Sequence, residues 1–202
     1  MASKESILMA TLELASQKGL GAVSLSQIAK KVGIQKASLY SHFSSKDEII
    51  DSLYKYLRTK AKNRQNIGEV DYGALVKGKT AVEVLRYALE SYRKMNEDPD
   101  MMQFYRFIVS ERPFEEEAAK IMVAETEKMI LATKQLFYAM QAQQVMHFSN
   151  VDMAAFSYAM SVHSMIDYIE DKKTAGMCDD GDEKMIEDFI EEFVRVYGTE
   201  QG

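Results

Sequence analysis

Apolar residues recur three and four positions apart along almost the whole chain, the spacing that places them on one face of an α-helix. Ten glycines and two prolines interrupt the 202 residues, too few for a protein built from many strands and turns. Fourteen methionines add unbranched side chains that favour helix. We therefore expect an all-α protein of about nine helices, with no strand and no internal repeat. The expected helices span residues 3–18, 25–32, 36–43, 46–64, 81–95, 99–111, 114–144, 150–173 and 182–197.

The single cysteine, Cys178, excludes an internal disulfide and any metal site that needs several thiolates. Such cysteine usage is typical of a reducing compartment, so we expect a cytoplasmic protein. Residues 7–14 resemble a short signal segment, but Glu13 interrupts them. No other apolar run approaches the roughly eighteen residues that span a membrane. We expect a chain that is neither exported nor membrane-spanning.

Charge is distributed unevenly along the chain. Residues 1–66 carry 11 Lys and Arg against 5 Asp and Glu, whereas the remaining 136 residues carry 14 against 26. A basic head beside an acidic body suits binding of a polyanion by the head. The alternative is that five of these cations only decorate the end of the helix at 46–64, where the helix dipole favours positive charge. These five are Lys55, Arg58, Lys60, Lys62 and Arg64.

Two short helices meet at a glycine turn near the N-terminus. Ser24 and Gln27 have capping-box spacing, and the helix that they open ends at Gly33. In the segment that follows, Leu39 and Phe43 lie one turn apart and face inward, which leaves its polar residues for another surface. This pattern predicts a helix-turn-helix, in which the second helix enters the major groove of DNA.

Three strings sharpen that prediction: Leu25-Ser26-Gln27-Ile28-Ala29, the run from Gly33 to Phe43, and Ser45-Lys46-Asp47-Glu48-Ile49. Together they closely resemble the DNA-binding signature of TetR-type transcriptional regulators over roughly the first 55 residues. The resemblance implies a DNA-binding domain at residues 1–46 and a helical ligand-binding and dimerisation domain at 47–202. It also implies a ligand-responsive homodimer, most simply a repressor that a small, largely apolar effector releases from a palindromic operator. Such a regulator needs neither enzymatic activity nor a cofactor.

The resemblance assigns contacts with DNA to nine positions. These are Ser24 and Ser26 beside the duplex backbone, Gln35, Lys36, Ala37 and Ser38 facing bases, and Tyr40, His42 and Lys46 on phosphates. Their hydroxyl, phenol, imidazole and ammonium groups suit these roles, and Lys46 adds charge at a helix N-terminus. Gln35 stands where the family often has a capping Ser, which predicts a weaker cap. Ala15 stands where a larger aromatic residue is common.

Methionine and aromatic residues are frequent in the body, which fits either an ordinary core or an adaptable apolar pocket. The pocket interpretation has six candidate ligand contacts: Met102, Tyr105, Met122, Phe156, Met160 and His163. For His163 a hydrogen-bonded core or interface position is favoured over a pocket or sensor role. Control by a protein partner is the alternative to control by a small molecule.

The segment from Gly73 to Thr80 matches the P-loop pattern G-x-x-x-x-G-K-S/T. A working P-loop follows a buried strand, but the residues before Gly73 are polar. We therefore expect a loop and a helix cap at Thr80 rather than a nucleotide hydrolase. We expect no metal site from the three histidines, and the acidic residues 179–183 predict a solvated turn.

The last two expected helices carry apolar residues on more than one stripe. In the final helix these are Phe189, Ile190, Phe193 and Val194. Such a surface exceeds what one side of a helix buries, so we expect these two helices to form the dimer surface as a four-helix bundle.

Overall fold

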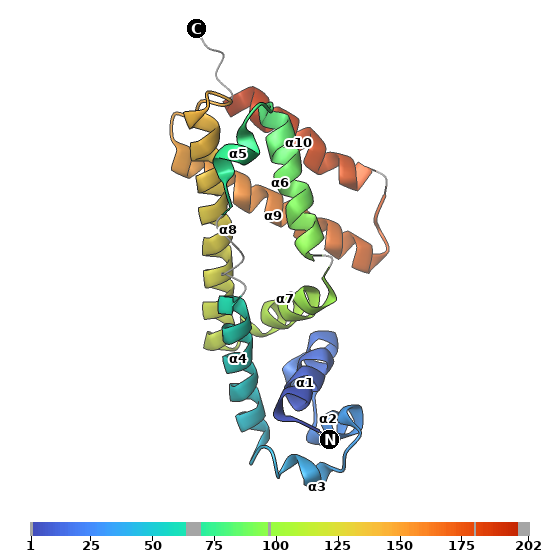
Figure 1. The fold of residues 1–202 in the computed structure, drawn as a ribbon. Coiled ribbons are helices and arrows are strands. Elements are labelled where there is room, and N and C mark those ends of the chain that lie inside the picture. Colours follow the sequence, from blue (N-terminus) through green and yellow to red (C-terminus); the bar gives the residue numbers. More distant parts are fainter. Residues whose placement is uncertain (1, 64–69, 97, 180, 198–202) are drawn as a thin grey trace. The chain divides into compact units, whose positions relative to one another are not determined.

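The computed structural model describes residues 2–63, 70–96, 98–179 and 181–197, and all regular structure in these ranges is helical (Figure 1). This confirms the all-α prediction. The elements are α1 (Lys4–Lys18), the 3-10 helix η1 (Leu20–Ala22), α2 (Leu25–Val32), α3 (Lys36–Leu39), α4 (Lys46–Asn63), α5 (Tyr72–Val76), α6 (Ala81–Asn96), α7 (Pro99–Glu111), α8 (Glu116–Ala142), α9 (Val151–Ala175) and α10 (Gly181–Tyr197). No helix within the described ranges is long and apolar enough to cross a membrane.

The chain packs as two compact units, Met1–Glu69 with Lys94–Ala124 and Val70–Arg93 with Glu125–Gly202. In the first unit α1 packs against α2, α4 and α7, and α2 packs against α3. Burial against these neighbours holds the two short helices, which are too short to persist alone in water. The predicted functional boundary at residues 46 and 47 differs from this division, because α4 and α7 pack with the N-terminal helices.

A single buried cluster forms the core of the first unit. Residues that are almost wholly buried reach it from α1, α2, α3, α4, α7 and α8, among them Ile7, Ile28, Leu39, Leu53, Phe107 and Ala118. Phe107 brings a ring from far along the chain to within 5.6 Å of the Tyr54 ring, measured between centroids. The core that supports the N-terminal helices is therefore completed by α7.

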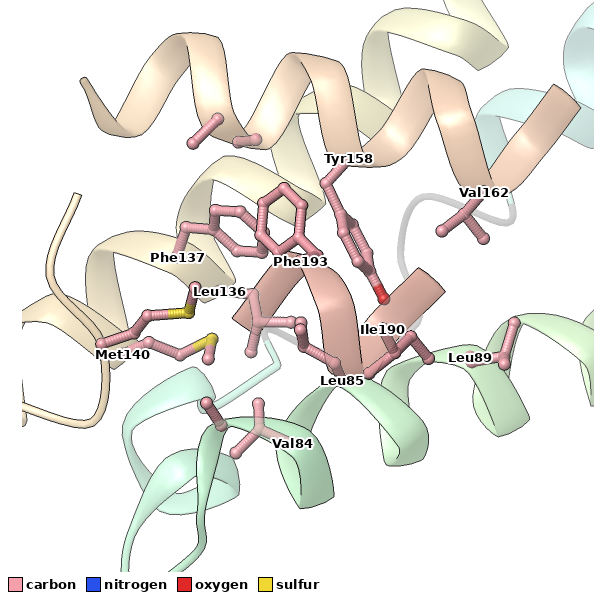
Figure 2. Packing of buried hydrophobic residues seen from close by; sticks show 14 of the residues in the cluster. Val84, Leu85, Leu89, Leu136, Phe137, Met140, Tyr158, Val162, Ile190 and Phe193 are labelled. Carbon is pink, nitrogen blue, oxygen red and sulfur yellow. The ribbon is translucent and has the colours of Figure 1, made fainter. Parts of the chain in front are cut away.

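Aromatic rings pack against one another within the largely aliphatic core of the second unit (Figure 2). Phe137 of α8 stacks on Phe148 at a centroid distance of 4.7 Å, and Tyr158 of α9 meets the Phe193 ring edge-on at 4.9 Å. Such offset and edge-on pairs are the favourable arrangements for aromatic rings. Leu85 of α6 and Ile190 of α10 close the cluster and are wholly buried.

This burial removes two of the four residues that we expected at the dimer surface. Ile190 is 0% and Phe193 is 4% exposed within a single chain, so neither is available to a partner subunit. The second apolar stripe of α10 exists because α6, α8 and α9 all contribute to the same core as this helix. Phe189 and Val194 are only half-buried at its edge.

Two further expectations about helices were wrong. α3 ends at Leu39 rather than Phe43, because the Leu39 carbonyl accepts the N–H groups of both His42 and Phe43 at 2.9 Å and closes a tight turn. Part of the loop that we expected before Thr80 is helix α5, whose first turn is capped by Asp71, with the Ala74 N–H donating to its carboxylate at 2.9 Å. The expected end of the fourth helix at Arg64, and residues 66–69, lie outside the described residues.

Asp182 departs from the solvated turn that we expected over 179–183, whereas Asp179 is exposed. α10 begins at Gly181, so Asp182 is inside the helix, and its side chain is buried. It accepts hydrogen bonds from the Lys172 ammonium and from the Asp179 N–H, which offset the cost of its burial. Asp180 lies outside the described residues.

The caps that we expected at Ser24 and Thr80 are confirmed. Ser24 and Gln27 form a reciprocal capping box, as do Thr80 and Glu83, and hydrogen bonds from Thr80 lower the pKa of the Glu83 carboxyl. Asn150 caps α9 by accepting the Met153 N–H at 3.0 Å. The P-loop-like segment is thus a short helix, a turn and the cap of α6.

Candidate nucleic-acid interface

A glycine turn joins α2 to α3. Gly33 has φ 78° and ψ 32°, a left-handed conformation that residues with a Cβ adopt at a cost. The next N–H, that of Ile34, donates to the Ala29 carbonyl at 3.0 Å and closes the end of α2. The chain therefore turns sharply at Gly33, and α3 leaves the axis of α2.

Two anchors hold α3 and the turn after it. Leu39 is 1% and Phe43 is 3% exposed, as expected from their spacing of one turn. Between them, Tyr40 is 52% exposed, Ser41 is exposed and His42 is half-buried. Gln35 precedes the helix without a side-chain cap, which confirms the weaker cap predicted for this position. The amide of Gln35 is thus not used by the backbone of α3.

The structure places most of the nine predicted DNA-contacting residues at the surface of this motif. The exposed ones are Ser24, Ser26, Gln35, Lys36, Ala37, Ser38 and Tyr40, whereas His42 and Lys46 are half-buried. The Ser24 hydroxyl is engaged by the Gln27 N–H at 3.3 Å within the capping box. Five of the nine, from Gln35 to Ser38 and Tyr40, come together on or beside the single turn of α3.

Lys46 makes a hydrogen bond that sequence reasoning missed. Its ammonium donates to the carbonyl oxygen of Leu20 at 3.1 Å, which ties the first residue of α4 to η1. No local pattern signals this bond, because the two residues lie 26 positions apart. An ammonium has three N–H donors, so this bond leaves two for another acceptor.

The start of α4 is firmly capped around Lys46. The Ser45 hydroxyl accepts the Glu48 N–H at 3.0 Å, and the Glu48 carboxylate accepts the Ser44 N–H at 2.6 Å and its hydroxyl at 2.7 Å. Both Ser44 and Ser45 therefore take part in capping the start of α4. These bonds from Ser44 lower the pKa of Glu48 and keep it charged where the helix dipole favours an anion.

The lysines of α2 differ in their availability. Lys31 forms an ion pair with Glu13 of α1 at 2.5 Å, whereas Lys30 is exposed on the same helix. Lys36 adds an exposed ammonium on α3. Positive charge thus accompanies the exposed hydroxyl and amide groups of the motif, a combination suited to phosphate and base edges.

The six predicted ligand-contacting residues divide equally between the two units. Met102, Tyr105 and Met122 belong to the first unit, and Phe156, Met160 and His163 lie on α9 of the second. Five are half-buried, while Phe156 is 44% exposed. The Nδ1 of His163 lies 3.0 Å from the Tyr92 hydroxyl, and its Nε2 lies 3.7 Å from a carboxylate oxygen of Asp167. His163 therefore occupies the hydrogen-bonded position that we favoured, and the pocket stays a prediction.

Among the described residues, no three His, Cys, Asp or Glu side chains gather so that they could hold a metal ion. What the N-terminal unit does present is a short helix with exposed polar and basic groups, set by a glycine turn after a helix whose Ile28 and Ala29 are buried. This arrangement defines a helix-turn-helix DNA-binding protein.

Two family models match the chain. Residues 7–60 match the model described as bacterial regulatory proteins, tetR family, and residues 83–199 match the AefR-like transcriptional repressor C-terminal domain. The chain belongs to the TetR family of bacterial transcriptional regulators. The resemblance inferred from the three N-terminal strings is thereby confirmed, and it extends to the body.

Curated relatives share mainly the N-terminal part. The chain is 42% identical over 55 residues to the uncharacterised regulator YvdT of Bacillus subtilis, a match covering 27% of this chain and 28% of YvdT. It is 31% identical over 94 residues to the regulator AcrR of Shigella flexneri, covering 44% of this chain and 41% of AcrR. The chain thus matches less than half the length of these relatives.

Solved structures share the fold over nearly the whole chain. A TetR-family regulator from Mesorhizobium loti has a TM-score of 0.66 at 17% identity, covering 97% of this chain and 96% of that one. The flavonoid-responsive regulator FrrA has a TM-score of 0.59 at 23% identity, covering 96% and 94%. At these identities the likeness concerns the fold alone.

Proposed function

We propose that the protein is a cytoplasmic transcriptional repressor that binds a palindromic DNA operator as a homodimer and leaves it when a small molecule binds the body. The observation that carries the proposal is the exposed polar side of α3, which Leu39 of the helix and Phe43 of the following turn anchor by facing inward. An AefR-like repressor domain matches the body, which supports repression as the sign of control. This role requires no enzymatic activity.

In the proposed complex α3 enters the major groove. Gln35, Lys36, Ala37 and Ser38 face bases there. The phosphate contacts come from Tyr40, His42 and Lys46, while Ser24 and Ser26 bring the start of α2 to the backbone. Helix N-termini attract phosphate, which supports a phosphate contact for Lys46, the first residue of α4.

The proposed effector is a small, largely apolar molecule. Half-buried methionine and aromatic side chains supply adaptable apolar surface in each unit: Met102, Tyr105 and Met122 in the first, and Met160 in the second. The FrrA regulator, which has the same fold, is named for its response to flavonoids. In the second unit, His163 and Tyr92 add polar groups of the kind that orient a ligand in an apolar site.

Selection of duplexes from a random-sequence pool by the wild-type protein tests the DNA part. We expect a near-palindromic consensus whose half-sites lie on one face of the duplex. A panel of flavonoids then tests the effector part. A compound that binds should raise the melting temperature and weaken binding to the selected duplex together, because a ligand shifts an equilibrium only by its difference in affinity for the two states.

Two results would contradict the proposal. Enrichment of no duplex, or of one without symmetry, would argue against a dimeric operator-binding protein. A compound that stabilises the protein and leaves the duplex affinity unchanged would show that its site does not control DNA binding. Control by a protein partner would then be the better explanation.

A further inference from the structure

Side chains from two distant helices bind both polar backbone groups of Leu20. This residue begins η1, the link between α1 and α2, and its side chain is 4% exposed. Its N–H donates to the Glu111 carboxylate at 2.9 Å, and its carbonyl oxygen accepts the Lys46 ammonium at 3.1 Å. One residue therefore connects the end of α7 to the start of α4.

The Glu111 carboxylate is buried and hydrogen-bonded within the first unit. Glu111 is 8% exposed, and its Oε1 atom accepts the Ser110 hydroxyl at 3.2 Å as well as the Leu20 N–H. A buried carboxylate is costly unless it is hydrogen-bonded, and the Leu20 N–H offsets that cost for Glu111. A hydrogen bond to a carboxylate is also stronger than one between neutral groups. Burial, together with the carboxylates of Glu111 and Glu115, raises the pKa of the Tyr54 hydroxyl of α4.

Gly19 makes this approach feasible. Its φ of 79° and ψ of 150° belong to a region that is almost restricted to glycine. A Cβ at this position would lie 3.9 Å from the Glu111 Oε1 atom, so the carboxylate faces the turn itself. The turn presents the Leu20 N–H to α7, although the two residues are 91 positions apart.

We propose that Glu111 is a positioning residue for DNA binding. It holds the Leu20 backbone, and the Leu20 carbonyl in turn holds the Lys46 ammonium where α4 begins. The inference rests on the proposed phosphate contact of Lys46. It assigns a part in DNA binding to a buried residue of α7 that touches no DNA.

The test compares Glu111→Met with Glu111→Gln and Glu115→Met, alone and combined with Lys46→Ala. Methionine keeps the volume of Glu111 and removes the acceptor, while glutamine keeps an acceptor. Glu115 is exposed, so Glu115→Met controls for the removed charge. The probe is the duplex that the wild-type protein selects from a random pool, measured well below the unfolding temperature of every variant.

We expect Glu111→Met to bind this duplex roughly fivefold more weakly than Glu115→Met, a usual size for coupling within one hydrogen-bond network. Glu111→Gln should restore most of this affinity. In the Lys46→Ala background, Glu111→Met should cause no further loss. Hydrogen exchange at the Leu20 amide should be faster in Glu111→Met than in Glu115→Met, because only the former removes its acceptor.

A purely structural role gives a different pattern. Glu111→Met would then lower the unfolding temperature but bind the duplex as tightly as Glu115→Met does. Alternatively, it would weaken binding by the same factor with and without Lys46. Either result overturns the inference. If Glu111→Met does not fold, Glu111→Gln replaces it, and we expect it to lose less than about fivefold in affinity and only when Lys46 is present. Failure of the wild-type protein to select any duplex would instead refute the proposed function.

Discussion

At the residue scale, the N-terminal motif presents neutral polar side chains at α3 and a hydrogen-bonded lysine at the start of α4. Gln35 and Ser38 lie exposed at α3, and neither side chain caps the helix. Lys46 is half-buried and fixed by the Leu20 carbonyl. Neutral groups that approach base edges distinguish sequences, whereas an ammonium on a phosphate attracts any duplex. Substitutions at these positions should therefore have different consequences.

Lys46→Ala should weaken binding to the selected duplex and to random DNA by the same factor. It should also reduce the slope of log affinity against log salt concentration by about one per subunit, because one fewer counterion is released.

Ser38→Ala or Gln35→Ala should weaken binding to the selected duplex by about 1–3 kcal/mol for each hydrogen bond to a base that is removed. Binding to random DNA should stay unchanged. Binding titrations across a salt series measure both effects. Lys77→Ala, at an exposed lysine of the second unit, is the control.

The assignment of roles fails if Lys46→Ala binds as the wild-type protein does. It also fails if Gln35→Ala and Ser38→Ala lose affinity for both duplexes alike. Either outcome would leave the helix-turn-helix fold intact and assign DNA binding to other residues.

At the scale of elements, an ionic cluster joins the end of α9 to the start of α10. Lys172 in the last turn of α9 binds the buried carboxylate of Asp182, and it lies 3.4 Å from the Asp179 carboxylate. The Lys172 hydrogen bond and the Asp179 N–H lower the pKa of Asp182, and the bond to Asp182 raises the pKa of Lys172. Both shifts favour the charged forms in the folded state.

The sign of the pH dependence follows from these directions. A lowered carboxyl pKa contributes stability above the ordinary pKa of Asp, and that stability is lost as pH falls through the folded value. Asp182→Asn should therefore be less stable than wild type at neutral pH and lose less stability on acidification between about pH 5 and pH 2. Thermal unfolding across this range measures the difference, with exposed Asp188→Asn as the control. Parallel curves for wild type and Asp182→Asn would contradict the linkage.

At the scale of the whole molecule, the proposed dimer needs apolar surface that a single chain leaves uncovered. Met153 and Phe156 lie one turn apart on α9 and are 56% and 44% exposed. On α10, Val196 and Tyr197 are 58% and 41% exposed. These side chains, rather than the buried Ile190 and Phe193, are the ones we propose for the interface between subunits. Phe156 thus suits a dimer surface better than a ligand pocket.

Phe156→Glu should convert the dimer into a monomer at micromolar concentration, because it places a charge in an apolar interface. Tyr87→Glu is the matched control, since Tyr87 is 53% exposed on α6, outside the proposed surface. Light scattering reports the mass of each variant. The proposed surface is wrong if Phe156→Glu remains dimeric, or if both variants dissociate alike.

Much of the fold could be predicted because the signals are local. Caps such as Ser24 and Thr80, and breakers such as Gly33, act through bonds within about four residues, so they can be located without a tertiary structure. The inward direction of Leu39 follows from helical spacing, and Phe43 is buried as expected although it lies in the turn beyond α3. These local signals were sufficient to predict the polar side of α3, and the N-terminal residues were sufficient to indicate the family. Helix α5 was missed because glycines within and just after it are equally typical of a loop.

Tertiary structure decided what depends on partners far away in the sequence. Whether the second stripe of α10 meets solvent or a core depends on α6, α8 and α9, so Ile190 and Phe193 could not be placed by periodicity. The bonds of Leu20 to Glu111 and Lys46 join residues 91 and 26 positions apart, and no spacing rule connects them. Periodicity specifies which face of a helix is apolar, but only packing determines what covers that face and which polar groups end up paired.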